Sequence, residues 1–174
     1  METQLKKIGY TKSLALLVAT ILLVGVVWML THADAARAQA PRLDYMNLHG
    51  EKIAAEQLHG KVYLVNFWAT SCATCVKEMP KMVETYEKFH GRGFELIAVA
   101  MASDQPNFVV NFAETRQLQF QVVLDLDGSM AQAFGGILGT PTTFLINKKG
   151  QILKKYVGEP SFEELASLIE HELS

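Results

Sequence analysis

The stretch VYLVNFWATSCATC, residues 62–75, contains a change of periodicity that decides the fold. Residues 62–68 form a nearly continuous apolar run rich in β-branched and aromatic side chains, which is typical of a strand buried on both faces of a sheet. From Cys72 onward the apolar residues fall at helical spacing, and Gly91 stands where that helix would end. The stretch therefore predicts a strand, a tight turn and a helix, with Cys72 and Cys75 at the turn.

The rest of the sequence continues the alternation of strands and helices. Further strands are expected at 94–101, 121–124, 142–146 and 151–156, and helices at 107–116, 130–134 and 161–169. A small hairpin is expected at 45–53 and a short helix at 54–58. The first two long strands would form a parallel pair with a right-handed crossover, whereas the last two strands predict an antiparallel hairpin. We therefore expect an α/β sandwich, a mixed central β-sheet flanked by helices.

The chain has only two cysteines, Cys72 and Cys75. A disulfide that closes so short a loop would stabilise the fold by at most about 2 kcal/mol and would tie no distant segments together. The pair could instead be half of a zinc site, but the five histidines are scattered and the sequence has no second CxxC and no HxxxH. We therefore interpret the cysteines as a redox pair.

Their position gives the two cysteines different roles. The first turn of a helix has unpaired backbone N–H groups and the positive end of the helix dipole, so a thiolate at Cys72 would be stabilised there. Cys75 lies one turn further along, on the apolar side, and is expected to be more shielded. Cys72 is therefore the predicted nucleophile, and Cys75 is expected to act second.

The N-terminal segment is directed to a membrane. An apolar run from Leu14 to Leu30 follows three lysines and contains no charged residue. Two A-x-A-like cleavage sites follow it, at 33–35 and 38–40, but the run is longer than the apolar core of a usual signal peptide, which favours retention. We divide the chain into a cytoplasmic n-region (1–12), a transmembrane signal anchor or signal peptide (13–30), a linker (31–40) and a folded domain (41–174).

Three motifs together resemble one family: the turn from Trp68 to Cys75, the Lys77-Glu78-Met79-Pro80 that follows it, and the later Gly139-Thr140-Pro141. With the membrane-directed lead, they resemble the TlpA and ResA type of membrane-anchored thiol-disulfide oxidoreductases in the thioredoxin superfamily. The resemblance implies a thioredoxin-like fold and a monomer. It also implies protein thiols and disulfides as partners, an electron donor at the membrane, and no cofactor beyond the Cys72–Cys75 disulfide.

The same resemblance implies a cellular location and a direction of electron transfer. The domain would lie in the periplasm or extracytoplasmic space of a bacterium, held by a single span of the inner membrane. It would act as a reductant, with apocytochrome c thiols as a candidate substrate. Cys72 would attack a partner disulfide, and Cys75 would resolve the mixed disulfide.

Four further residues receive roles. The resemblance implies that Glu78 is a partly buried acid near Cys75, where it could accept and return a proton, and that Pro141 is cis and faces the cysteines. The backbone of Thr140 would then pair with an extended substrate. Trp68 is expected mainly to pack beside the turn, with contact to partner proteins secondary. From the residues alone, Glu78 could equally be a solvated charge paired with a nearby lysine, and Pro141 an ordinary strand opener.

The other function classes are less well supported by the sequence. From residue 41 onward, 12 Lys and Arg against 16 Asp and Glu give a net charge of −4, which is not a nucleic-acid-binding balance. A peroxidase of the peroxiredoxin type would need Pro at 65 and Thr or Ser at 69, where the chain has Val65 and Ala69. A Cu(I)-binding or delivery module could use the two thiolates, although Met79 and Met82 fall on the side expected to be core. A copper titration of the reduced domain would separate this alternative.

Overall fold

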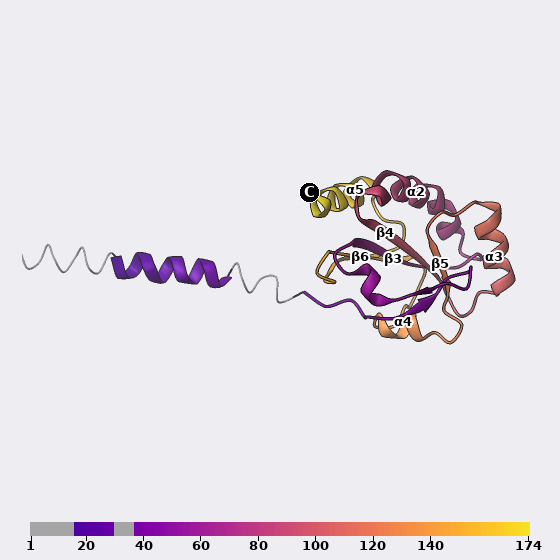
Figure 1. The fold of residues 1–174 in the computed structure, drawn as a ribbon, viewed down its shortest axis with the longest axis horizontal. Helices are drawn as coiled ribbons and strands as arrows, with labels where there is room; N and C mark the ends of the chain where they lie inside the picture. The colour runs from indigo at the N-terminus through magenta and orange to yellow at the C-terminus, as the bar shows by residue number, and fades with distance from the viewer. Residues whose placement is uncertain (1–15, 30–36) are drawn as a thin grey trace, which may run out of the picture. The chain divides into compact units, whose positions relative to one another are not determined.

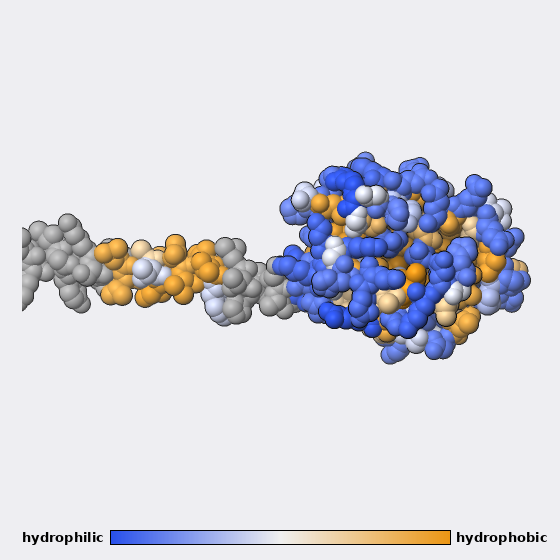
Figure 2. All heavy atoms as spheres, viewed as in Figure 1, coloured by the Kyte–Doolittle hydropathy of each residue, from blue (hydrophilic) through white to orange (hydrophobic). Residues whose placement is uncertain are grey.

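The computed structural model describes residues 16–29 and 37–174, which belong to two separate units divided after residue 37. Residues 16–29 form a helix, and Figure 2 shows apolar side chains along it. Within the described ranges, no helix combines the length and the hydropathy needed to cross a membrane. The predicted n-region 1–12 and the ends of the predicted anchor 13–30 lie outside the described residues, so the anchor stays a prediction.

The second unit is built on a five-stranded mixed sheet with the order β5-β4-β3-β6-β7 (Figure 1). Its strands are β3 (Val62–Trp68), β4 (Phe94–Ala100), β5 (Gln121–Leu124), β6 (Thr142–Ile146) and β7 (Ile152–Val157). Strands β3, β4 and β5 run parallel, whereas β6 is antiparallel to both β3 and β7. The expected mixed sheet is confirmed, and β3 lies at its centre.

The helices cover both faces of this sheet. They are α2 (Ala73–Phe89), α3 (Pro106–Thr115), α4 (Ser129–Ala133) and α5 (Phe162–Leu173), with the 3-10 turns η1 (Ala55–Leu58) and η2 (His90–Arg92). Residues of α2, α3 and α5 share one hydrophobic cluster with Leu64 and Trp68 of β3. Residues of α4 join Val65 and Phe67 in the cluster on the opposite face. Successive side chains of a strand point to opposite faces of the sheet. Because helices cover both faces, all seven residues of β3 are buried.

The shorter predicted elements are also present. A two-stranded hairpin joins β1 (Tyr45–Met46) to β2 (Lys52–Ile53), and η1 follows it as the expected short helix. Helix α5 begins after Ser161, whose side chain accepts a hydrogen bond from the Glu164 N–H, as the capping pattern predicts. Helix α2 begins at Ala73, with Cys72 as its N-cap.

The folded unit begins at Ala38, three residues before the predicted boundary at 41. The N–H of Ala40 donates to the carbonyl of Gly150, and the N–H of Ile152 donates to the carbonyl of Ala38, both over 2.8 Å. Residues 38–40 therefore pair with the chain at the start of β7. Nothing local in this alanine-rich segment indicates a strand, because the pairing partner lies more than a hundred residues away.

Candidate active site

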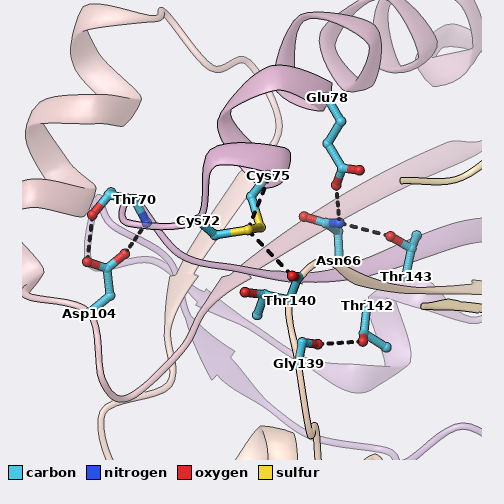
Figure 3. The surroundings of a disulfide bond; sticks show 10 residues. All are labelled: Asn66, Thr70, Cys72, Cys75, Glu78, Asp104, Gly139, Thr140, Thr142 and Thr143. Atoms are coloured by element: carbon cyan, nitrogen blue, oxygen red, sulfur yellow. Dashed lines mark hydrogen bonds between the residues drawn. A yellow bond between two sulfur atoms is a disulfide. The ribbon is translucent and has the colours of Figure 1, made fainter. Parts of the chain in front are cut away.

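The two cysteines lie where β3 ends and α2 begins, and they form a disulfide (Figure 3). The backbone N–H of Cys75 donates to Sγ of Cys72 over 3.2 Å, so Cys72 caps the helix with its sulfur. Cys72 is partly exposed, whereas Cys75 is 0% exposed. This geometry matches the expected difference between an accessible first sulfur and a shielded second one.

The loop before β6 brings a backbone carbonyl to the disulfide. The Thr140–Pro141 peptide is cis, as the resemblance implies, and the carbonyl oxygen of Thr140 lies 3.5 Å from Sγ of Cys72. A disulfide sulfur carries no hydrogen, so this contact is a close approach that becomes a hydrogen bond only when Cys72 is a thiol. The Gly158 N–H donates to the carbonyl of Pro141, and the Thr142 hydroxyl donates to the carbonyl of Gly139. These bonds hold the loop against the site.

A buried polar cluster lies on the side of the sheet that faces α2. Glu78 is 0% exposed, and its Oε1 accepts a hydrogen bond of 3.0 Å from the side-chain amide of Asn66. The same amide donates to the Thr143 hydroxyl over 2.9 Å, because Asn66 and Thr143 are directly paired across β3 and β6. The other carboxylate oxygen of Glu78, Oε2, has no hydrogen-bond partner.

Burial dominates the electrostatics of Glu78. It raises the pKa of the carboxyl to about 7, against the opposing effect of the Asn66 hydrogen bond and with a smaller contribution from the charge of Glu159. The alternative that Glu78 is a solvated charge paired with Lys77 or Lys81 is wrong, because both lysines form ion pairs with Glu159 instead. The carboxyl is also more deeply buried than the partly buried acid that was expected.

Trp68 is a core residue in this structure. Its side chain is 0% exposed and lies against Phe112 of α3, with ring centroids 5.1 Å apart. The packing role is therefore supported. A side chain without exposed surface cannot touch a docked protein, so the structure offers nothing for the predicted contact between Trp68 and partner proteins.

Sequence reasoning missed two groups that shape the site. Asp104, in the loop between β4 and α3, accepts a hydrogen bond of 2.5 Å from the Thr70 N–H and one of 2.6 Å from the Thr70 hydroxyl. This carboxylate ties the turn that precedes Cys72 to the neighbouring loop (Figure 3). Asn66 was the second omission, although a single amide within an apolar strand is a signal for a buried polar contact.

The fold and this site together define a class of protein. A cysteine pair that opens a helix, with one sulfur accessible and the other enclosed, can accept two electrons from another protein's thiols when it is a disulfide, or donate two to another protein's disulfide when it is reduced. Such a site on a thioredoxin-like scaffold is that of a thiol-disulfide oxidoreductase.

Comparisons with known proteins identify the family. The Redoxin family model matches residues 33–169. The thiol-disulfide oxidoreductase ResA of Bacillus thuringiensis is 37% identical over 128 residues, which are 73% of this chain and 72% of that protein. The crystal structure of a thiol:disulfide interchange protein from Chlorobium tepidum has a TM-score of 0.73 and 29% identity, covering 79% of this chain and 97% of that one. StoA from Bacillus subtilis has a TM-score of 0.64 and 29% identity, covering 74% and 96%.

The chain therefore belongs to the Redoxin family, among its thiol-disulfide oxidoreductases of the ResA type.

Proposed function

We propose that this protein is an exported, membrane-tethered reductant of protein disulfides. The observation that carries the proposal is the asymmetry of the two sulfurs, since Cys72 is partly exposed and Cys75 is fully enclosed. In the reduced protein, the Cys72 thiolate attacks one sulfur of a partner disulfide, and the other partner sulfur leaves as a thiolate that takes up a proton. Cys75 then attacks Sγ of Cys72, which closes the Cys72–Cys75 disulfide and releases the second partner thiol.

Glu78 handles the proton of Cys75 in this proposal. The thiol must lose its proton before it can attack, and a carboxylate one helical turn further along α2 can accept that proton. A carboxyl with a pKa of about 7 is present in both forms near neutral pH, so it can take the proton and return it. The oxygen without a hydrogen-bond partner, Oε2, is the atom that would carry it.

The Thr140–Pro141 segment is the proposed docking edge for the substrate. A partner chain that pairs in extended form with the backbone of Thr140 would bring its own sulfur beside Cys72, given the 3.5 Å between Sγ and the Thr140 carbonyl oxygen. Main-chain pairing of this kind depends on the extended backbone of the partner segment more than on the identity of its side chains. It therefore suits a reductant of protein disulfides, such as a disulfide between the cysteines of apocytochrome c.

The proposed location follows from the N-terminal segment. The lysines before the apolar run favour a cytoplasmic N-terminus, with the domain in the periplasm or extracytoplasmic space of a bacterium. An electron donor in or at the same inner membrane would reduce the disulfide again after each cycle. The full-length protein is expected to stay with membranes after a carbonate wash, and a soluble form that begins near Ala36 or Pro41 would contradict the tether.

The direction of electron flow is tested by the equilibrium potential of the Cys72–Cys75 pair against glutathione. Potentials of related dithiols extend from about −270 mV for thioredoxin to about −120 mV for DsbA. A reductant should lie near the thioredoxin end. A value near that of DsbA would identify an oxidant and would overturn the proposal.

A further inference from the structure

The side-chain amide of Asn66 has a hydrogen-bonding capacity that the oxidised structure uses only in part. Its nitrogen donates to Glu78 and to Thr143, whereas its carbonyl oxygen, Oδ1, has no hydrogen-bond partner. Asn66 is 1% exposed, so bulk water does not reach that oxygen. A buried acceptor without a partner lowers stability, and its retention needs an explanation. One explanation is a donor that exists only in another state of the site.

The Oδ1 atom points toward the disulfide. Asn66 lies between Leu64 and Trp68 on the face of β3 that α2 covers. Cys75 belongs to the hydrophobic cluster on that face. Figure 3 shows the amide with its oxygen on the side of the two sulfurs and its nitrogen on the side of Thr143. A disulfide sulfur has no hydrogen to donate, whereas Cys75 carries an S–H when the pair is reduced. Reduction therefore creates a donor on the side to which Oδ1 points.

We propose that Asn66 is a positioning residue that holds both partners of the proton transfer between Cys75 and Glu78. In the reduced protein, the Cys75 thiol donates a hydrogen bond to Oδ1, while Nδ2 holds the Glu78 carboxylate. The S–H bond then breaks and an O–H bond forms at Oε2 of Glu78. The electron pair left on the Cys75 sulfur attacks Sγ of Cys72 in the mixed disulfide, and the partner sulfur leaves as a thiolate. This inference deepens the proposed function and rests on its proton transfer to Glu78.

The bond from Nδ2 also affects the pH at which Glu78 can accept a proton. Burial raises the pKa of Glu78 to about 7, and the Asn66 hydrogen bond opposes that rise because it stabilises the carboxylate. The charge of Glu159 acts in the same direction as burial but contributes less, and Glu159 is paired with Lys77 and Lys81 of α2. Without the Asn66 bond, the carboxyl would stay protonated to a higher pH. The amide therefore keeps the proton acceptor available near neutral pH.

Strand β7 and helix α5 bring further titratable groups to this part of the fold. Tyr156 packs on the same hydrophobic cluster, and burial raises the pKa of its phenol, which is therefore neutral at pH 7. Lys154 of β7 and Glu164 of α5 form an ion pair with each other. A step in the exchange rate near pH 7 is therefore assigned to Glu78.

The first test is the pH profile of the rate at which the reduced protein reduces a model protein disulfide. Asn66→Leu keeps a side chain of similar size and removes both proposed contacts. The step near pH 7 should then move to higher pH by roughly one unit, which corresponds to the loss of one hydrogen bond to a charged group. Thr143→Val is the matched control, because it removes only the remaining contact of the amide and should leave the step in place.

The second test is the equilibrium of the Cys72–Cys75 pair with glutathione, measured in a Glu78→Gln background so that the titration of Glu78 does not contribute. Asn66→Leu removes the acceptor of the Cys75 thiol from the reduced protein and an unpartnered carbonyl from the oxidised protein. Both changes favour the disulfide. The equilibrium constant should therefore shift toward the disulfide by about threefold or more, and Thr143→Val should leave it unchanged.

Three results would overturn the inference. A step that stays near pH 7 in Asn66→Leu, although Glu78→Gln abolishes it, would show that the amide does not hold the carboxylate for the reaction. An unchanged glutathione equilibrium would show that Oδ1 takes no hydrogen bond from Cys75. Equal shifts in Asn66→Leu and Thr143→Val would assign the effect to core packing. Failure of the proposed function is recognised separately, because the step would then persist in Glu78→Gln, while the glutathione equilibrium would still test the contact with Cys75.

Discussion

The side-chain amide of Asn66 joins Glu78 to the sheet, with a hydrogen bond of 3.0 Å from Nδ2 to Oε1. Its second N–H is directed to Thr143, so the amide has no further hydrogen to offer. The carboxyl of Glu78 is therefore fixed through one oxygen only. A polar group held in this way within the core keeps its orientation while its protonation changes.

The first prediction concerns Glu78 in the exchange reaction. The carboxylate form is the proton acceptor, and its fraction increases as the pH rises through about 7. The rate of reduction of a model protein disulfide should therefore show a step near that pH, and Glu78→Gln should remove the step and slow the reaction at neutral pH. Stopped-flow rates across the pH range measure this. Glu84→Gln, an exposed position on the same helix, is the matched control, and an unchanged profile in Glu78→Gln would contradict the proposed role.

The second prediction concerns stability and the same carboxyl. The fold raises the pKa of Glu78 from 4.5 to about 7, so the folded state binds its proton more tightly than the unfolded chain does. This contribution to stability is fully present below the unfolded pKa, declines as the pH rises from about 4.5 to 7, and is absent above 7. The pKa difference corresponds to a decline of about 3 kcal/mol in the free energy of unfolding.

Glu78→Gln should lack that decline, because an amide does not titrate. Denaturant unfolding of the oxidised protein at several pH values measures the difference between the two proteins. A difference that does not change between acidic and neutral pH would show that the carboxyl titrates at an ordinary value.

The third prediction assigns the two sulfurs. Cys75→Ser leaves the accessible nucleophile without its resolving thiol, so mixed disulfides with partner proteins should accumulate, visible on non-reducing gels and lost with dithiothreitol. Cys72→Ser should trap few or none, because Cys75 is enclosed. Equal trapping by the two variants, or faster labelling of Cys75 than of Cys72 by iodoacetamide in the reduced protein, would reverse the assignment.

The fourth prediction concerns the contact between Asp104 and Thr70. Asp104→Ala removes the acceptor of both hydrogen bonds from Thr70 and of a third from the Gln105 N–H. The partly buried end of this contact, the Thr70 N–H, loses its partner, which should cost roughly 1–3 kcal/mol in the free energy of unfolding. Thr70→Val removes only the hydroxyl bond and should cost less. If the contact also positions Cys72, Asp104→Ala should slow thiol exchange, and Asp104→Asn should restore part of that loss. Equal stability of Asp104→Ala and Thr70→Val would show that the two backbone hydrogen bonds to Asp104 contribute nothing.

The sequence predicts the scaffold well, because its signals are local. The apolar run of β3, the helical spacing after Cys72 and the turn at Asn147–Gly150 each fall within a few residues. The end of α2 differs from the prediction in the glycine that is left-handed. The chain continues through the 3-10 turn η2, and the left-handed residue is Gly93, with φ of 91°, instead of the expected Gly91.

The parts that could not be predicted depend on distant partners. Asp104 meets Thr70 across 34 positions of sequence, and Asn66 meets Thr143 across 77. The helical pattern places Glu78 on α2, but only the sheet beneath it decides that its carboxyl is buried. The cis peptide at Pro141 was expected from resemblance, since the residues alone favoured an ordinary trans bond.

The pairing of residues 38–40 with the start of β7 has a consequence for proteolytic processing. Proteases cut chain that is exposed and loosely held, yet Ala40 is only 7% exposed, and its N–H is bonded to Gly150. In the folded protein, the bond after Ala40 is therefore protected by the sheet. A peptidase that used this site would have to act before the domain folds. The extent of processing there would therefore depend on the rate of cleavage relative to the rate of folding.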